Sequence, residues 1–445
     1  MTENFVHSYI PHTDSERREM LNSIGVNHLE DLFLEIPERY RDPDIKLAPS
    51  LTEMELLQEL EFLSAKNVQV GKMPSFLGGG AYSHFIPSAV SALTSRGEFL
   101  TSYTPYQPEV SQGTLQATYE FQSMVCELTG MDVANAGMYD GATAFAEAAL
   151  MACRLTKRYR VYVLESVNSN YLAVLKTYLV PQSVEIVIVP DNVNQVDEDV
   201  ACLLVQYPDA LGTIPNLSSL GKLIHAVGGL FVVSVYPVAL GILKPPSEYE
   251  ADIVTGECQS LGVPLSFGGP YVGMFACKSE HLRQIPGRIV GKTNESHGGK
   301  EGFVLTLQTR EQHIRREKAT SNICTSEALI ATAVAIHLAL LGPKGIKQVA
   351  QLCYNKAHYA AKCIGEIPGF FINPHAPDKY WFNEFVVTGP KSADHIQKNL
   401  YDQGIVGGIK ISNLVKDGLL FCVTEVNSKQ EIDSLVRALD SMKEL

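Results

Sequence analysis

The residues best suited to line a binding site lie together in the segment Tyr103–Gly113, whose sequence is YTPYQPEVSQG. Its tyrosines and glutamines donate hydrogen bonds without carrying charge, and Glu109 adds one carboxylate. Pro105 and Pro108 restrict the backbone, so less entropy is lost when these side chains are held in place. The segment predicts either a loop that lines a site or an ordered loop that only precedes a helix.

Two further segments have the composition of anion-binding turns. Gly78–Gly80 is a glycine run followed by Ala-Tyr-Ser-His84, but it lacks both G-x-G-x-x-G spacing and the Gly-Lys-Ser/Thr of a P-loop. Asp140–Ala144, DGATA, is predicted to join a short strand to a helix, where free N–H groups can meet an anion. We interpret the first as a closely approached or flexible loop and the second as a tight turn without a ligand.

The segment Gln308–Lys318 mixes four basic residues with two glutamates, a pattern that predicts a solvated or interface helix. His313 has no evident catalytic partner there, and a lone helical histidine is more often structural. The sequence contains no H-E-x-x-H motif, zinc-ligand pattern or G-x-S-x-G elbow. Metal-dependent hydrolysis and serine hydrolysis are therefore poorly supported.

Composition limits the class of protein. The 445 residues are 45% hydrophobic and 19% charged, which is typical of a globular chain with a sizeable core. The net charge of −13 argues against binding to nucleic acid or to an anionic membrane. Nine cysteines without a C-x-x-C pair, and an N-terminus without a signal pattern, predict a reduced, cytoplasmic protein. The apolar stretch 328–341 is short for a membrane span and contains a histidine, so we expect a core helix.

The elements that must position these segments follow from hydrophobic periodicity. Capping boxes at Thr13…Glu16, Asn27…Glu30 and Ser50…Glu53 predict a helical N-terminal segment. A helix is expected from Ser111 to Gly130. Strands are expected at 160–164, 184–189, 202–207, 230–236, 252–254 and 272–276, with helices near 141–155, 169–178 and 216–227. Continuous apolar strands separated by helices predict an α/β domain with a mainly parallel sheet.

The C-terminal part has a different pattern. Helices at 325–341 and 344–365 precede strands at 384–387, 408–411 and 419–423, with a helix at 392–403 and a last helix beginning at the capping box Ser428…Glu431. This predicts a small α+β domain. We expect a helical segment at 1–70, a large α/β domain at 71–325 and the small domain at 326–445.

Four long runs of the sequence closely resemble the glycine cleavage system P-protein family. They are YTPYQPEVSQG (103–113), MVCELTGMDVANA (124–136), GVPLSFGGP (262–270) and QTREQHIRREKATSNICT (308–325). The chain is similar, over essentially its whole length, to the N-terminal half of single-chain members and to subunit 1 (α) where the enzyme is split in two.

The resemblance implies a fold and an activity. Members of the family are pyridoxal phosphate (PLP) enzymes of fold type I that decarboxylate glycine and pass the aminomethyl group to the lipoyl arm of H-protein. In the split form the cofactor lysine lies on subunit 2 (β) and the assembly is α2β2. T-protein and L-protein of the same system would be indirect partners.

The same resemblance implies that this chain has lost its own cofactor site. A fold-type-I site needs a lysine for covalent attachment of PLP, an Asp at the pyridine nitrogen and usually a stacking His. The matching positions hold Ser260, Ser234 and Asn168, and no lysine occurs between Lys244 and Lys278. We expect the chain to complete the site of its partner.

Specific roles follow from this expectation. Residues predicted to act in the partner's site are Tyr103, Tyr106, Gln107 and Glu109. Residues predicted to approach the partner's PLP are Thr320, Ser321 and Asn322. Residues predicted to bind glycine are Thr104, Gln112 and His84.

Two other hypotheses remain open. The chain is a docking subunit that supports the β chain and binds H-protein without touching glycine, or it is an autonomous PLP enzyme that uses another lysine, such as Lys278 or Lys292. Activity of loop variants distinguishes the first, and the absorbance of PLP bound to the single chain distinguishes the second.

Overall fold

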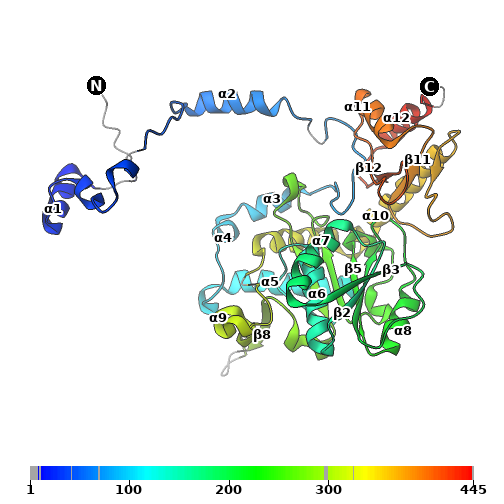
Figure 1. Ribbon diagram of the computed structural model, residues 1–445, viewed down its shortest axis with the longest axis horizontal. Helices are drawn as coiled ribbons and strands as arrows, with labels where there is room; N and C mark the ends of the chain where they lie inside the picture. The colour runs from blue at the N-terminus through cyan, green and yellow to red at the C-terminus, as the bar shows by residue number, and fades with distance from the viewer. Residues whose placement is uncertain are drawn as a thin grey trace. The chain divides into compact units, whose positions relative to one another are not determined.

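The computed structural model, drawn in Figure 1, describes residue 9 and residues 12–41, 43–68, 71–294, 299–323 and 325–442. It divides into two compact units, Met1–Val68 and Gln69–Leu445. Of the segment predicted to approach the partner's PLP, Cys324 lies outside the described residues. The domain boundary expected at residues 325 and 326 stays a prediction.

The first unit is helical, as its capping boxes predicted. The box at Thr13 and Glu16 is confirmed at the start of α1 (Asp14–Ile24). The other two boxes lie one and two residues further on than predicted. His28 and Asp31 cap the 3₁₀ helix η1 (Leu29–Phe33), and Thr52 and Glu55 cap α2 (Glu53–Ser64).

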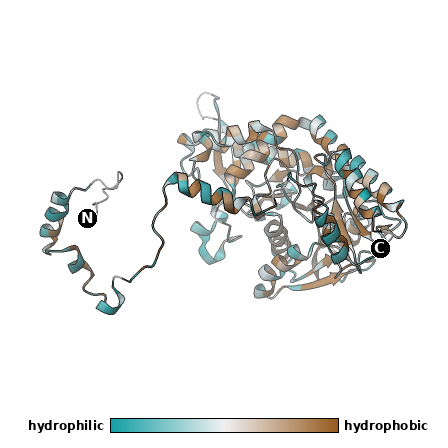
Figure 2. Cartoon of the chain, turned by 90° about the horizontal axis from the view of Figure 1, so that it is seen from above, coloured by the Kyte–Doolittle hydropathy of each residue, from teal (hydrophilic) through white to brown (hydrophobic). Residues whose placement is uncertain are grey.

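The first unit has no core of its own. None of the residues in 12–41 and 43–68 is buried, although many are large and apolar. Hydrophilic and hydrophobic residues alternate along α2 (Figure 2). Exposed apolar side chains include Leu29, Leu32, Phe33, Leu34, Ile36, Leu56, Leu57, Leu60 and Phe62. Burial of such side chains is the main stabilising term in folding, so this unit needs another surface to cover it.

The second unit is built on a mainly parallel sheet, which confirms the predicted α/β fold. Within the described residues this sheet has seven strands in the order β1-β7-β6-β5-β4-β2-β3. Strands β2 to β6 pair in parallel, and β7 is antiparallel to both β6 and β1. The strands are β1 (Val133–Ala134), β2 (Arg160–Leu164), β3 (Glu185–Val189), β4 (Val200–Tyr207), β5 (Leu230–Val235), β6 (Ile253–Glu257) and β7 (Gly273–Cys277).

Helices connect and cover these strands. They are α3 (Ser88–Thr94), α4 (Gly97–Leu100), α5 (Gln112–Thr129), α6 (Gly141–Thr156), α7 (Ser169–Leu179) and α8 (Leu217–Ala226). Helix α6, drawn in front of the strands in Figure 1, packs against β4, β6 and β7. Eleven of its sixteen residues are buried, which fits a helix with apolar side chains all around. Gly130 ends α5 in the left-handed conformation, as predicted.

A hairpin that the sequence did not predict lies beside α5. It consists of β8 (Ile289–Asn294) and β9 (Glu301–Thr306), paired antiparallel. Two glutamines of α5 hold it: the Gln122 amide bonds both N and O of Val290, and the Gln112 amide bonds both N and O of Phe303. Side-chain amides therefore replace a neighbouring strand at each edge of the hairpin.

The prediction of a helix at 308–318 is wrong. The segment forms short turns, including α9 (Gln312–Arg315), and Arg316 has a positive φ of 52° that ends the helical path. Arg310 does not face solvent, because its guanidinium donates to the carbonyls of Ile285 and Gly287. Glu311 is buried as well. Some of the charged side chains that predicted a solvated helix instead make contacts inside the protein.

The two helices predicted between 325 and 365 form one bent element, α10 (Ala328–Gly365). Gly342 has φ 58° and ψ −177°, and Pro343 follows it, so the helix changes direction there. By length and composition alone, α10 is the one described helix that could cross a membrane. It contacts α5, α3 and α12 and buries Val334, His337 and Cys353, as expected of a core helix.

The C-terminal part forms a smaller antiparallel sheet with its own core. Within the described residues its strands are ordered β10-β11-β13-β12, with bounds Phe371–Ile372, Glu384–Thr388, Leu419–Cys422 and Ile409–Lys410. Helices α11 (Ala393–Asp402) and α12 (Lys429–Asp440) pack on it, and the capping box Ser428…Glu431 is confirmed. Phe76 lies fully buried in this core, because its backbone bonds Val406 and Cys422.

Candidate functional site

The predicted loop Tyr103–Gly113 is exposed and tightly folded. Tyr106 N donates to Thr104 O at 2.8 Å, and Pro108–Val110 form a single 3₁₀ turn, η3, before α5. Pro105 and Pro108 thus lie in a restricted, turn-like backbone, as their positions in the sequence predicted. The Tyr103 and Tyr106 side chains are 83% and 59% exposed. Such exposure of two aromatic rings on an ordered loop is typical of a contact surface.

This loop forms one wall of an open cavity of about 380 Å³. The opposite walls come from α4, α5, the β8–β9 hairpin and the start of α10. The lining residues that matter for the argument are Tyr103, Thr104, Pro105, Arg288, Thr325 and Ser326. A volume of this size lies within the range of small-molecule sites. The cavity therefore joins all four segments on which the family resemblance rests, since Ala136 and Pro270 line it as well.

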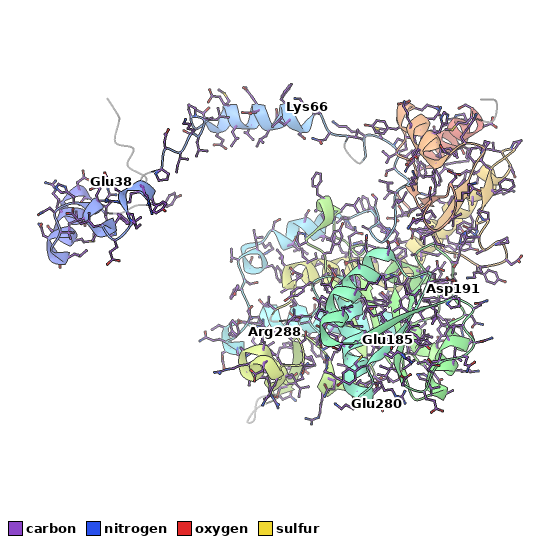
Figure 3. All side chains as sticks on the ribbon, viewed as in Figure 1. Glu38, Lys66, Glu185, Asp191, Glu280 and Arg288 are labelled. Atoms are coloured by element: carbon purple, nitrogen blue, oxygen red, sulfur yellow. The ribbon has the colours of Figure 1, made fainter. Side chains whose placement is uncertain are left out.

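A buried ion pair between Arg288 and Glu311 lies next to the loop. Arg288, labelled in Figure 3, is 5% exposed and lies 5.3 Å from the centre of the Tyr106 ring. Its Nε is 3.5 Å from Oε2 of Glu311, which is 6% exposed. The guanidinium thus attracts the face of the Tyr106 ring while its charge is balanced by a carboxylate. The loop gains a positioned aromatic ring at Tyr106 without an uncompensated cation beneath it.

The remaining loop residues separate into two groups. Gln107 and Glu109 are exposed, and among the described residues neither side chain makes a hydrogen bond. Gln112 differs, because its amide donates to the carbonyls of Pro108 and Phe303 and accepts from Phe303 N. Its donors are fully used by the protein backbone. Gln112 thus has a structural role in this chain, and its predicted contact with substrate stays a prediction.

His84 is also a structural residue rather than a free ligand for glycine. Its side chain is 4% exposed, and both ring nitrogens are engaged. Nδ1 lies 2.6 Å from Oε2 of Glu425, and Nε2 lies 2.5 Å from the Tyr236 hydroxyl. A ring held on both sides cannot also bind a substrate without breaking one of these contacts.

Thr320, Ser321 and Asn322 lie at another cavity, of about 420 Å³, with Glu147 and Arg154 of α6. Ser321 Oγ donates to Glu147 Oε1 at 2.9 Å. The structure therefore does not bring these three residues to the cavity of loop 103–113, although Thr325, three residues further on, lines it. Its predicted approach to the partner's PLP stays a prediction.

The positions expected to hold a cofactor surround a much smaller space. Ser234 near the end of β5 and Asn168 at the start of α7 line a cavity of about 40 Å³ together with Gly79 and Gly80. That is room for roughly three water molecules. Ser260, which stands where the lysine is expected, lines a different cavity. These three positions no longer form one site.

The protein's own carboxylates occupy the anion-binding turns that the sequence suggested. Glu384 Oε1 accepts from Gly79 N at 2.6 Å, in the glycine loop. Glu257 Oε2 accepts from Gly141 N at 2.9 Å, at the N-terminus of α6. Sequence analysis missed both residues. The available signal was a glutamate at the end of an otherwise apolar strand, since a buried carboxylate needs such donors.

Comparison with known proteins decides the family. The glycine cleavage system P-protein family matches residues 7–439. Probable glycine dehydrogenase (decarboxylating) subunit 1 of Desulfitobacterium hafniense is 49% identical, over 98% of this chain and 100% of that protein. The corresponding protein of Thermomicrobium roseum is 48% identical, over 97% of this chain and 98% of that protein.

The chain belongs to the glycine cleavage system P-protein family. A crystal structure of glycine decarboxylase (P-protein) in inhibitor-bound form has a TM-score of 0.91 and 43% identity, covering 98% of this chain and 100% of that one. Lactobacillus brevis glutamate decarboxylase, at 13% identity and a TM-score of 0.64, shares the fold over 91% of this chain and 96% of that chain. The predicted family and the fold-type-I architecture are confirmed.

The residues of this P-protein chain do not fit a PLP of their own. Its small cavity is lined by the carboxyl groups of Asp209, Glu257 and Glu384, and its described lining residues include no lysine, arginine or histidine to bind a phosphate. Of the lysines proposed as substitutes, Lys278 is ion-paired with buried Asp252, and Lys292 is paired with Glu301 on the exposed hairpin. Among the described residues that line the cavity there is no lysine.

These carboxyl groups predict a pH dependence of the stability of the P-protein chain. Burial raises the pKa of Glu257 and of Glu384 to about 7, and that of Asp209 to about 6. The folded chain therefore holds protons that the unfolded chain releases, so stability falls as pH rises through 7. We expect the free energy of unfolding to drop by about 2 kcal/mol between pH 6.5 and 8.

Urea unfolding at the two pH values measures this drop. His337, whose pKa burial lowers to about 4, offsets only about 0.4 kcal/mol of this drop, because the unfolded imidazole loses its remaining half proton between about pH 6.5 and 8. Glu257→Gln is expected to reduce the slope, whereas replacement of the exposed Glu280 by Gln leaves it unchanged. A flat profile in the unmodified chain would contradict the assignment of buried, protonated carboxyls.

Proposed function

We propose that this chain is the subunit of a split glycine decarboxylase that carries no covalent PLP and completes the site of a PLP-bearing subunit 2. The relatives named subunit 1 support the division into two chains. In the complete enzyme, bound PLP supplies the electron sink for loss of CO2 from glycine. The aminomethyl group then passes to lipoylated H-protein. We place the α2β2 assembly in the cytoplasm.

One observation carries the proposal. The chain keeps an exposed, proline-restrained loop at the edge of a cavity of about 380 Å³, while the cavity at the positions matching a cofactor site measures about 40 Å³. The cavity beside this loop contains none of the positions matched to the PLP site, which supports a role for the loop in the site of a partner. Tyr103 and Thr104 line the larger of these two cavities. The Tyr106 ring lies over the Arg288 guanidinium.

The chemistry of the loop suits a carboxylate that must leave as CO2. Tyr103, Tyr106 and Gln107 offer neutral hydrogen-bond donors, which orient glycine without stabilising its carboxylate as strongly as a free cation does. Glu311 balances the Arg288 charge, so the guanidinium beneath the Tyr106 ring is not a free cation. We propose that Glu109 holds the loop in place against the partner and does not transfer a proton.

Replacing Tyr106 by Phe, and separately Gln107 by Ala, tests the proposal. Each variant chain, combined with subunit 2, is expected to lower turnover about 10- to 100-fold, because a hydrogen bond to a charged substrate group is worth about 1.5–3 kcal/mol. Glycine-dependent exchange of CO2 with H-protein measures the turnover. The PLP content and the sedimentation of the complex should not change.

Tyr401→Phe is the matched control, because Tyr401 of α11 is similarly exposed, at 54%. It is expected to keep the unmodified rate. If both loop variants also keep that rate, the chain places no group near glycine, and the docking-subunit hypothesis replaces the one proposed here.

A further inference from the structure

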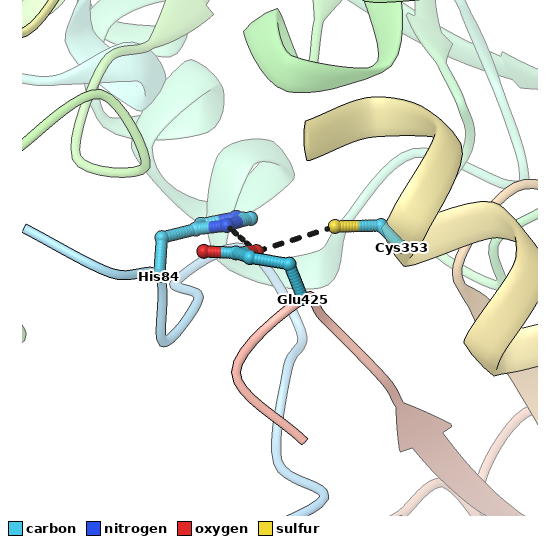
Figure 4. Close-up of side chains that lie close together, drawn as sticks. All are labelled: His84, Cys353 and Glu425. Carbon is cyan, nitrogen blue, oxygen red and sulfur yellow. Dashed lines mark hydrogen bonds and ion pairs between the residues drawn. The ribbon is translucent and has the colours of Figure 1, made fainter. Parts of the chain in front are cut away.

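Three potential metal ligands from distant parts of the sequence meet inside the second unit. They are His84 after the glycine loop, Cys353 in the second half of α10 and Glu425 after β13. One ligand atom of each lies within 4.8 Å of the others (Figure 4). The His84 and Glu425 side chains are 4% and 11% exposed, and Cys353 is fully buried. Such burial sets this cluster apart from a chance group of surface acids.

The three donor atoms form a set that Zn²⁺ prefers: an imidazole nitrogen, a sulfur and a carboxylate oxygen. Nδ1 of His84 is 2.6 Å, and Sγ of Cys353 is 3.4 Å, from Oε2 of Glu425. Tetrahedral bonds of about 2.0–2.3 Å place neighbouring ligand atoms about 3.3–3.7 Å apart. The His–Glu contact has to open by about 1 Å, and Nδ1 of His84 and Sγ of Cys353, which lie within 4.8 Å of each other, complete the set with a shift of similar size.

Outer contacts already hold two of the ligands in the required orientation. The Tyr236 hydroxyl lies 2.5 Å from Nε2 of His84, which leaves Nδ1 as the atom facing the cluster. Phe85 N donates to Oε1 of Glu425 at 2.7 Å, which leaves Oε2 to face it. Metal-binding histidines and carboxylates are usually fixed by such second contacts.

A cavity of about 270 Å³ provides the open side of the cluster. It is lined by His84 and Glu425, by apolar residues of α10, and by Ser260 and His337. Ser260 Oγ and His337 Nδ1 are buried and have no hydrogen-bond partner among the described residues. Buried polar groups of this kind normally have a partner. A ligand between them and the cluster would satisfy them.

We propose that His84, Cys353 and Glu425 bind one Zn²⁺, whose remaining position opens into this cavity toward His337 and Ser260. Cys353 binds as the thiolate and releases its proton. The ion ties together the glycine loop, the second half of α10 and the segment after β13. The ion lies outside the cavity formed with loop 103–113, and its open position faces His337 and Ser260 instead.

Metal analysis of the full chain tests the proposal. The protein is purified without chelator from zinc-supplemented medium, and a second sample is stripped and titrated with Co²⁺. We expect about one zinc per chain, one Co²⁺ taken up with a thiolate-to-cobalt charge-transfer band, and a rise in Tm of about 5 °C. Cys353→Ser should abolish the band. Cys363→Ser, ten residues further along α10, should keep it.

Either of two results would overturn the proposal. One is substoichiometric zinc together with no thiolate band in the unmodified chain, a measurement that does not depend on any variant folding. The other is a band that persists in Cys353→Ser, which places the ion elsewhere. If Cys353→Ser does not fold, Glu425→Gln takes its place and must weaken Co²⁺ binding at least tenfold.

Discussion

Glycine decarboxylation by the isolated chain is expected to equal that of a protein-free control, and to become readily measurable when subunit 2 is added. Enzymes typically accelerate reactions by about 10⁶-fold or more, so the background of the assay sets the largest ratio of the two rates that can be measured. The reason lies in the chain itself: Ser260 cannot hold PLP, and three carboxyl groups crowd the cavity at Ser234 and Asn168. The measurement is CO2 exchange with H-protein, using chains free of host P-protein.

Ser260→Lys provides a stringent version of this experiment. A lysine at the matching position would restore the cofactor site if only the lysine had been lost. Because Ser260 lines the His84 cavity instead, we expect borohydride treatment with PLP to leave this variant without a unique pyridoxyl label. Stoichiometric labelling at one lysine, in the variant or in the unmodified chain, would show that a complete PLP site survives.

Arg288→Met is expected to cost about 3–5 kcal/mol of stability, because it removes the buried cation beside the Glu311 carboxylate and leaves that carboxylate only its contact with the exposed His313. Urea unfolding of the isolated chain measures the loss. Arg283→Met, at a nearby exposed position, should change stability by less than about 0.5 kcal/mol. Equal effects of the two substitutions would show that the ion pair is not important.

The double variant Arg288→Met/Glu311→Gln separates stability from positioning. Removing both charges should restore most of the stability. The Tyr106 ring still loses the cation beneath it, an attraction worth about 0.5–1 kcal/mol, so turnover of the complex should remain about two- to fivefold low. Full recovery of the rate would mean that Arg288 serves the fold alone.

The sheet was predictable because its strands are continuous apolar runs between helices. Val200–Tyr207 and Leu230–Val235 are buried on both faces, so their pattern leaves little choice of structure. The hairpin β8–β9 was not predictable, since its exposed half resembles a loop and its edges are held by glutamines of α5. The helix predicted at 308–318 was wrong for a similar reason. Charged side chains of this segment contact residues that lie outside it in the sequence.

The candidate site was predictable only in part. Proline spacing identified loop 103–113, and the structure shows it ordered and exposed. Pairs such as Gly79 with Glu384 are 305 residues apart, so no local pattern connects them. His84 and Gln112 were assigned to substrate from residue type alone, whereas long-range contacts give them structural work. The type of a residue shows which hydrogen bonds its side chain can make. Only the folded structure shows which of them are already formed within the protein.

The apolar surface of the N-terminal unit has a consequence for an unpaired chain. Residues 12–41 and 43–68 bury no side chain, and their apolar faces have no cover within the unit. Exposed segments of this kind are preferred sites of proteolysis. If subunit 2 covers this surface, a copy made in excess of its partner would be degraded first, and selective degradation would help to set the ratio of the two subunits.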